Sequence, residues 1–216
     1  MLRSFSKSVL ALLMVAGLAT LSMAQDNDDS PRPITKSGSA AWIFSINGLG
    51  DFGVGGNDIQ TGDSDPVLAA GFRTFISDGL ALRALLGFST TSSGEKSDPS
   101  GAQSSTALGI AAGVEVHTGP LYSISPYFGG QVSFGMSGDK TETESNTNES
   151  SHSQFGIAAL AGFDWYFTKG IFLGAEYTLG FASTSSSTTS GGTTNDAPSS
   201  STIGIGSGNV HLGVHF

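Results

Sequence analysis

The sequence predicts an all-β protein, an eight-stranded antiparallel up-and-down transmembrane β-barrel with short periplasmic turns and long extracellular loops. Apolar residues recur at every second position in short segments, which is the period of a strand with one apolar face. The connections between these segments alternate between short and long, as they do in bacterial outer-membrane barrels. Aromatic residues gather near both ends of the segments, which is typical of a surface that faces lipid.

Residues 1–24 have the composition of a secretory signal peptide. Two basic residues precede an apolar run from Val9 to Leu21, and small residues close the segment. The run is shorter than a helix that spans a bilayer, which argues against an N-terminal anchor. We therefore expect residues 25–38 to form a short solvated periplasmic leader and residues 39–216 to form the outer-membrane β-barrel.

The first half of the barrel region predicts four strands, and each alternates apolar residues with small or polar ones. They are Ala40–Phe52, Val67–Ile76, Leu80–Ser89 and Thr106–His117. In the third, Leu82, Leu86 and Phe88 alternate with Arg83 and Ser89. The apolar set is expected to face lipid, and the other set is expected to face the lumen.

The second half predicts four more strands, at Ile124–Met136, Phe155–Phe167, Ile171–Phe181 and Thr202–Phe216. Each segment has about 10 to 13 residues, which suffices for a tilted strand to cross the apolar layer of an outer membrane. Because the number of strands is even, both termini are expected at the periplasmic end.

The predicted connections are short at 77–79, 118–122 and 168–170, and long at 53–66, 90–104, 137–153 and 182–201. The long ones hold most of the acidic charge and no aromatic residue. Protein-binding hot spots are usually Trp, Tyr or Arg, so no extracellular partner is indicated by these loops.

Two aromatic girdles are predicted on the lipid-facing side. One lies near the long loops and the other lies near the short turns. The residues of the first are Phe52, Phe88, Phe134, Phe155 and Phe181, and those of the second are Trp42, Phe44, Phe128, Phe163, Trp165, Phe167 and Phe216.

Five charged residues fall on the lumenal side of the predicted strands at similar distances from a short turn. They are Arg73, Arg83, Glu115, Asp164 and Glu176. A charge on the lipid side costs up to a few kcal/mol, so the alternation and the energetics agree on the lumen. A barrel of eight strands is only wide enough for its side chains to fill. We expect a structural plug, completed by Tyr127, Gln131 and Tyr166.

The sequence resembles the family of eight-stranded outer-membrane barrels typified by the transmembrane domain of outer membrane protein A. The likeness covers residues 39–216 and is carried by SPYFGG at Ser125–Gly130, GAEYTLGF at Gly174–Phe181 and the terminal VHLGVHF. It implies that Val210, Leu212, Val214 and Phe216 form the signal read by the barrel-assembly machinery. Since the chain stops at Phe216, we expect no peptidoglycan-binding domain.

Composition and motifs exclude several other functions. The chain has no cysteine and a net charge of −9, which argues against thiol chemistry, Cys zinc sites and nucleic-acid partners. The G-x-G-x-x-G at Gly48–Gly53 is followed by a loop rather than the helix of a dinucleotide site. His117, His211 and His215 share the lumenal side near the periplasmic mouth, where we expect them to bind water rather than a metal.

The leading hypothesis is a non-enzymatic barrel with no cofactor, plugged by side chains, with a structural or surface-interaction role and contacts to outer-membrane lipid and lipopolysaccharide. The main alternative is a small pore gated by the lumenal charge layer. A less favoured one is an outer-membrane enzyme centred on His152, which lies among serines in a predicted loop. A soluble, lipocalin-like secreted barrel would require the membrane assignment to be wrong.

Overall fold

A computed structural model describes residues 31–45, 69–93, 102–143 and 146–216. The predicted signal peptide, residues 25–30 of the predicted leader and Phe52 lie outside these residues. Nine strands form one antiparallel sheet in the described part of the chain. Their bounds are β1 Ala40–Ser45, β2 Ala69–Ser77, β3 Leu80–Ser93, β4 Ala102–His117, β5 Ile124–Thr143, β6 Asn146–Thr168, β7 Ile171–Ser190, β8 Thr193–Asp196 and β9 Ser200–His215.

Eight of the strands in the described residues pair in a closed ring. Strands β1 to β6 pair in sequence order. β6 then pairs with β7, β7 pairs with β9, and β9 pairs with β1, which closes the ring. The short β8 pairs with β7 alone and stays outside this ring. The predicted all-β, up-and-down architecture is therefore confirmed. No helix within the described ranges has the length and hydropathy needed to cross a bilayer.

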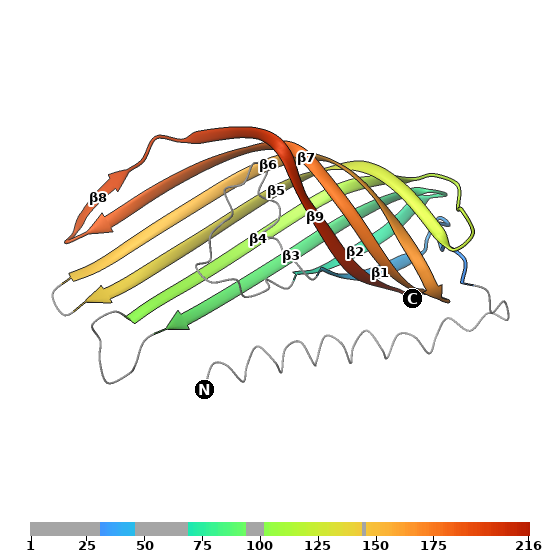
Figure 1. The fold of residues 1–216 in the computed structure, drawn as a ribbon, viewed down its shortest axis with the longest axis horizontal. Coiled ribbons are helices and arrows are strands. Elements are labelled where there is room, and N and C mark those ends of the chain that lie inside the picture. The colour runs from blue at the N-terminus through green and yellow to red at the C-terminus, as the bar shows by residue number, and fades with distance from the viewer. Residues whose placement is uncertain (1–30, 46–68, 94–101, 144–145) are drawn as a thin grey trace.

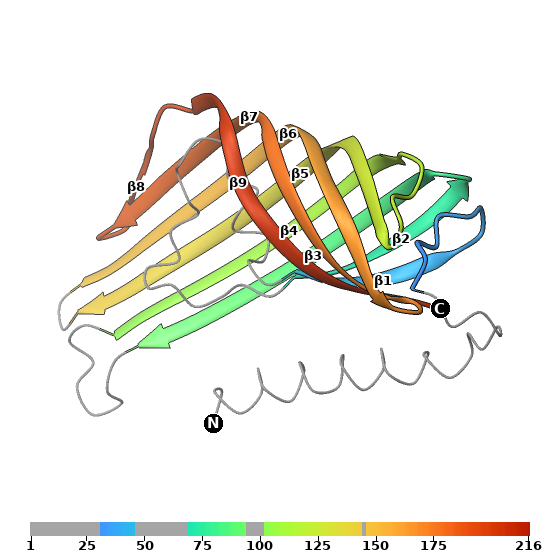
Figure 2. The same ribbon diagram turned by 45° about the vertical axis from the view of Figure 1, so that its right-hand side comes forward.

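The two ends of the barrel differ, as Figures 1 and 2 show. One end, here called the turn end, carries the tight connections β2–β3, β4–β5 and β6–β7 together with the C-terminus. The opposite end, here called the far end, carries the projecting ends of β3 to β7 and the β8 hairpin.

The strands at the far end continue well beyond their predicted limits, so the expected loop ranges 137–153 and 182–201 are wrong. β5 runs to Thr143, β6 starts at Asn146, and β7 runs to Ser190. The register fixed inside the barrel continues through Ser- and Thr-rich segments, which pair well across antiparallel strands. The part of β6 before Phe155 adds about 30 Å of strand at about 3.3 Å per residue.

This extension also moves charged residues from predicted loops onto strands. Lys140 of β5 lies 2.8 Å from the Glu142 carboxylate and 4.0 Å from that of Glu149 on β6. The predicted loop charges at 53–66 and 94–101 lie outside the described residues.

The described part of the predicted leader, residues 31–38, is hydrogen-bonded to the turn end, while Lys36, Ser37 and Gly38 stay exposed. The amide of Gly79 donates to Thr35 (2.8 Å), and the amide of Gly38 donates to Phe75 (2.8 Å). Ile34 packs against the buried cluster inside the barrel. Backbone hydrogen bonds with β2 and with the β2–β3 turn therefore hold this segment at the turn end.

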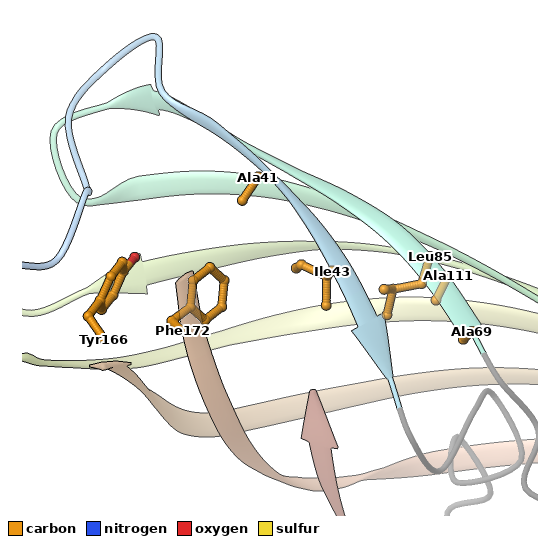
Figure 3. Close-up of a cluster of buried hydrophobic side chains, with 7 residues drawn as sticks. All are labelled: Ala41, Ile43, Ala69, Leu85, Ala111, Tyr166 and Phe172. Carbon is orange, nitrogen blue, oxygen red and sulfur yellow. The ribbon is translucent and has the colours of Figure 1, made fainter. Parts of the chain in front are cut away.

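The apolar part of the lumen has its large residues at the turn end. Figure 3 shows Tyr166 and Phe172 there, with Ile43, Leu85 and smaller residues further along the barrel. The ring centroids of Tyr166 and Phe172 are 5.1 Å apart. The outward face, in contrast, carries at least one exposed large apolar residue on every strand of the ring, with Trp42 on β1.

Candidate functional site

The five charged residues singled out from the sequence all point into the lumen. They come from five strands, with Arg73 on β2, Arg83 on β3, Glu115 on β4, Asp164 on β6 and Glu176 on β7. The side chains of Arg73, Glu115 and Asp164 are fully buried, and those of Arg83 and Glu176 are nearly so. The charged residues thus occupy lumen-facing positions of the alternating strands.

Arg73 joins two carboxylates from different strands. Its Nη1 lies 2.5 Å from Asp164 Oδ2, and its Nε lies 2.6 Å from Glu115 Oε2. Its Nη2 also donates to Glu115 Oε1 at 3.2 Å. One guanidinium therefore ties β2 to both β4 and β6 across the lumen.

Arg83 joins the remaining carboxylate to the same glutamate. Its Nη1 lies 3.0 Å from Glu115 Oε1 and 2.5 Å from Glu176 Oε2, while Nη2 donates to Glu176 Oε1 at 2.9 Å. Nη2 also donates to the Gln131 side chain, and the Tyr127 hydroxyl donates to Glu176 at 3.0 Å. The five charges form one chain in which anions and cations alternate, from Glu176 through both arginines to Asp164.

The arginines are themselves neighbours, since Arg73 and Arg83 are direct partners in the β2–β3 register. Like charges facing each other across strands are destabilising. Glu115 contacts both guanidinium groups. The position of Glu115 between them explains why the pair is tolerated in a buried layer.

The three histidines are buried in the lumen, so the expectation that they bind water at the rim is wrong. His117 contacts Glu115 (3.2 Å) and the Ser125 hydroxyl (2.9 Å). His211 Nε2 lies 3.2 Å from Asp164 Oδ1. His215 Nε2 lies 2.9 Å from the Tyr166 hydroxyl. Their side chains extend the network toward the turn end instead of facing solvent.

Aromatic rings form a layer beside the charges; the sequence reasoning placed His117 and Tyr166 in the lumen but missed Phe75 and Phe172, which pack against them. Phe75, His117 and Tyr166 each lie two residues after a network charge on the same strand, toward the turn end, so they share its lumenal side. Phe172 joins them, and the Arg73 guanidinium lies 5.3 Å from the ring centroid of Phe172. The spacing of two from each charge was the signal that could have found this layer.

Glycines leave the room that these side chains occupy. A Cβ at Gly174 would overlap the His211 ring, and one at Gly213 would overlap Phe172. A Cβ at Gly162 would lie 2.7 Å from the Tyr127 hydroxyl. Small residues on the lumenal side are therefore a packing requirement of the filled lumen.

The structure places the described girdle residues on the outward side. The girdle toward the far end consists of Phe88, Phe134, Phe155 and Phe181, and all four are exposed. The girdle toward the turn end has the exposed residues Trp42, Phe128, Phe163, Trp165, Phe167 and Phe216 and the half-buried Phe44. Trp42, Phe72 and Phe216 form a cluster with centroid separations of 5.7 to 6.3 Å.

The residues of the predicted assembly signal lie at the end of β9. Val210 and Phe216 are exposed, Leu212 is half-buried, and Val214 is buried between its register partners Trp42 and Ile171. No cluster of three or more metal-ligating side chains occurs among the described residues.

The fold and the site together define a class of protein, a β-barrel with an apolar outer surface and a lumen occupied by an ion network. The chain belongs to the outer membrane protein β-barrel domain family, whose model matches residues 9–215. It is thus an integral protein of the bacterial outer membrane.

Two solved structures are similar to this chain. The N-terminal β-barrel domain of Pseudomonas aeruginosa OprF is 16% identical over 84% of this chain and 97% of that one, with a TM-score of 0.34. The outer membrane protein AlkL is 19% identical over 89% of this chain and 96% of that one, with a TM-score of 0.45. No curated protein matches the sequence.

Proposed function

We propose that this protein is a non-enzymatic outer-membrane barrel, closed by its own side chains, with a structural or surface-interaction role. The observation that carries the proposal is the burial of the whole ion network, in which both guanidinium groups are shared between carboxylates of different strands. Breaking a buried pair leaves an uncompensated charge, so opening a path through this layer is costly.

The proposed orientation places the turn end and both termini in the periplasm and the far end outside the cell. Short periplasmic turns are the usual arrangement in these barrels, and this chain has its short turns at one end. In this orientation the projecting parts of β5 to β7 reach the level of lipopolysaccharide. The C-terminal residues Val210 to Phe216 are the part offered to the barrel-assembly machinery.

Single-channel conductance of the refolded protein in a planar bilayer tests the closed lumen. We expect the wild type to be silent. Arg83→Ala removes the partner shared by Glu115 and Glu176, and we expect it to admit ions if the barrel stays folded. Frequent openings of the wild type would contradict the proposal.

A small pore gated by the same layer is the second candidate function. It is favoured by the double contact of each arginine, because a guanidinium can lose one carboxylate and keep the other. Discrete wild-type openings whose frequency changes in Arg83→Ala would support the pore and reject the plug.

We propose no catalytic role for His152. Its place is on the extended part of β6, where it is exposed and is the register partner of Ser137 and Ser186. An adjacent Ser and His are frequent by composition in so serine-rich a segment. A loss of lipid or ester hydrolysis in His152→Ala, measured against wild type, would contradict this proposal.

A further inference from the structure

The connection between β4 and β5 is unlike the two other tight turns at the turn end. Leu121 and Ile124 exchange two backbone hydrogen bonds, of 2.8 and 2.9 Å, so that Tyr122 and Ser123 form the tip. The Ser123 carbonyl accepts a third bond of 2.8 Å from the amide of Tyr166 on β6. The tip is therefore held in place against its neighbouring strand.

Tyr122 has a backbone conformation that normally belongs to glycine. Its φ is +57°, and it is the only non-glycine residue with positive φ in the described ranges. The β2–β3 and β6–β7 turns place Gly79 and Gly170 in this region, each with φ of +76°. A tyrosine pays a steric cost that glycine avoids, and such an outlier motivates a search for what its side chain does.

Two neighbouring side chains of this turn, Leu121 and Tyr122, are large, mainly apolar and exposed. Tyr122 is 97% exposed and Leu121 is 61% exposed. The segment 118–126 contains no charged residue, whereas the two other turns contain Asp78 and Lys169. This turn can therefore enter a lipid interface without carrying a charge into it.

The tip continues the outer aromatic surface of the barrel. Ile124 is the register partner of Trp165, and the rings of Trp165 and Phe167 have centroids 5.9 Å apart on the outward side. Tyr122 is only two residues beyond Ile124, which is at most about 7 Å along an extended chain. The headgroup layer of a bilayer is about 5–8 Å thick on each side, so the tip is level with it.

We propose that Leu121 and Tyr122 form a lipid anchor that inserts into the headgroup layer of the membrane at the turn end. Tyrosine suits this layer because its ring is apolar and its hydroxyl reaches water and headgroups. The anchor fixes the depth of the β4–β5 turn, and through the bond to Tyr166 it fixes the adjoining end of β6. It does not depend on whether the lumen conducts.

Tryptophan fluorescence in lipid vesicles tests the anchor. The chain has two tryptophans, so replacing Trp42 and Trp165 by Phe gives a silent background. Tyr122→Trp in this background reports on the tip, and Leu121→Trp provides a second probe if the first does not fold. A protein that retains Trp165 alone is the membrane reference. Asn195→Trp on exposed β8, at the far end, is the aqueous reference.

Each protein is folded into phosphatidylcholine vesicles, brominated either near the headgroup end or near the end of the acyl chains. We expect the tip probe to lose emission most with bromine near the headgroup, and to be shielded from aqueous acrylamide relative to the β8 probe. If the tip probe and the β8 probe respond alike, with acrylamide quenching and no loss in brominated lipid, the turn faces water and the proposal is wrong.

Discussion

Replacing Arg73 by methionine should lower the free energy of unfolding far more than replacing a charged residue on the surface. The arginine contacts Asp164 and Glu115, and all three side chains are fully buried. Methionine fills much of the same volume but leaves Asp164 without its guanidinium partner. Removing one member of a buried pair costs about 3–5 kcal/mol, because the remaining charge stays buried. Glu115 keeps Arg83, so the loss should centre on Asp164.

The free energy of unfolding is measured by urea titration in vesicles, followed by the fluorescence of Trp42 and Trp165. The double variant Arg73→Met with Asp164→Asn removes the unpaired charge and should recover part of the loss. Lys36→Met is the matched control, since Lys36 pairs with Asp78 on the surface and both side chains are largely exposed. If Arg73→Met is no less stable than this control, the network does not stabilise the barrel and the reasoning is refuted.

Two further predictions concern the lumenal packing and the turn end. Gly174→Val should displace the His211 ring and destabilise the barrel by about 1–3 kcal/mol in urea, as overpacking does elsewhere. Gly130→Ala, whose added Cβ would have only a carbonyl at 3.6 Å nearby, should have little effect. The Ser37 amide donates to Asp78 and, with other contacts, lowers the pKa of that carboxyl below its ordinary 3.8. The contribution of Asp78 to holding the N-terminal segment is therefore present at neutral pH and should be lost as the pH falls from 3.8 through the lowered pKa. The protection of the Ser37 amide against hydrogen exchange, expressed relative to the intrinsic exchange rate at each pH, should fall on acidification in the wild type and should not depend on pH in Asp78→Asn.

Sequence alone determined which side of each strand meets lipid. The period of two places Arg83 opposite Leu82, and the cost of a charge in lipid decides which of them turns inward. The same two rules predicted that the five charges would lie in one lumenal layer. Both rules are local in the chain, and each depends only on residue type and spacing.

Tertiary structure decided how the charges pair and where the strands end. The contacts of Glu115 with both arginines depend on the stagger of β2, β3 and β4. This stagger cannot be derived from the sequence of any single strand. The long strands β5 to β7 form because neighbouring strands supply hydrogen-bond partners to Ser- and Thr-rich segments that look like loops when read alone. Strand pairing depends on neighbours that are distant in sequence. Residue type and spacing therefore identified the two faces of the barrel, whereas the contacts between charges and the length of the strands depend on the closed sheet.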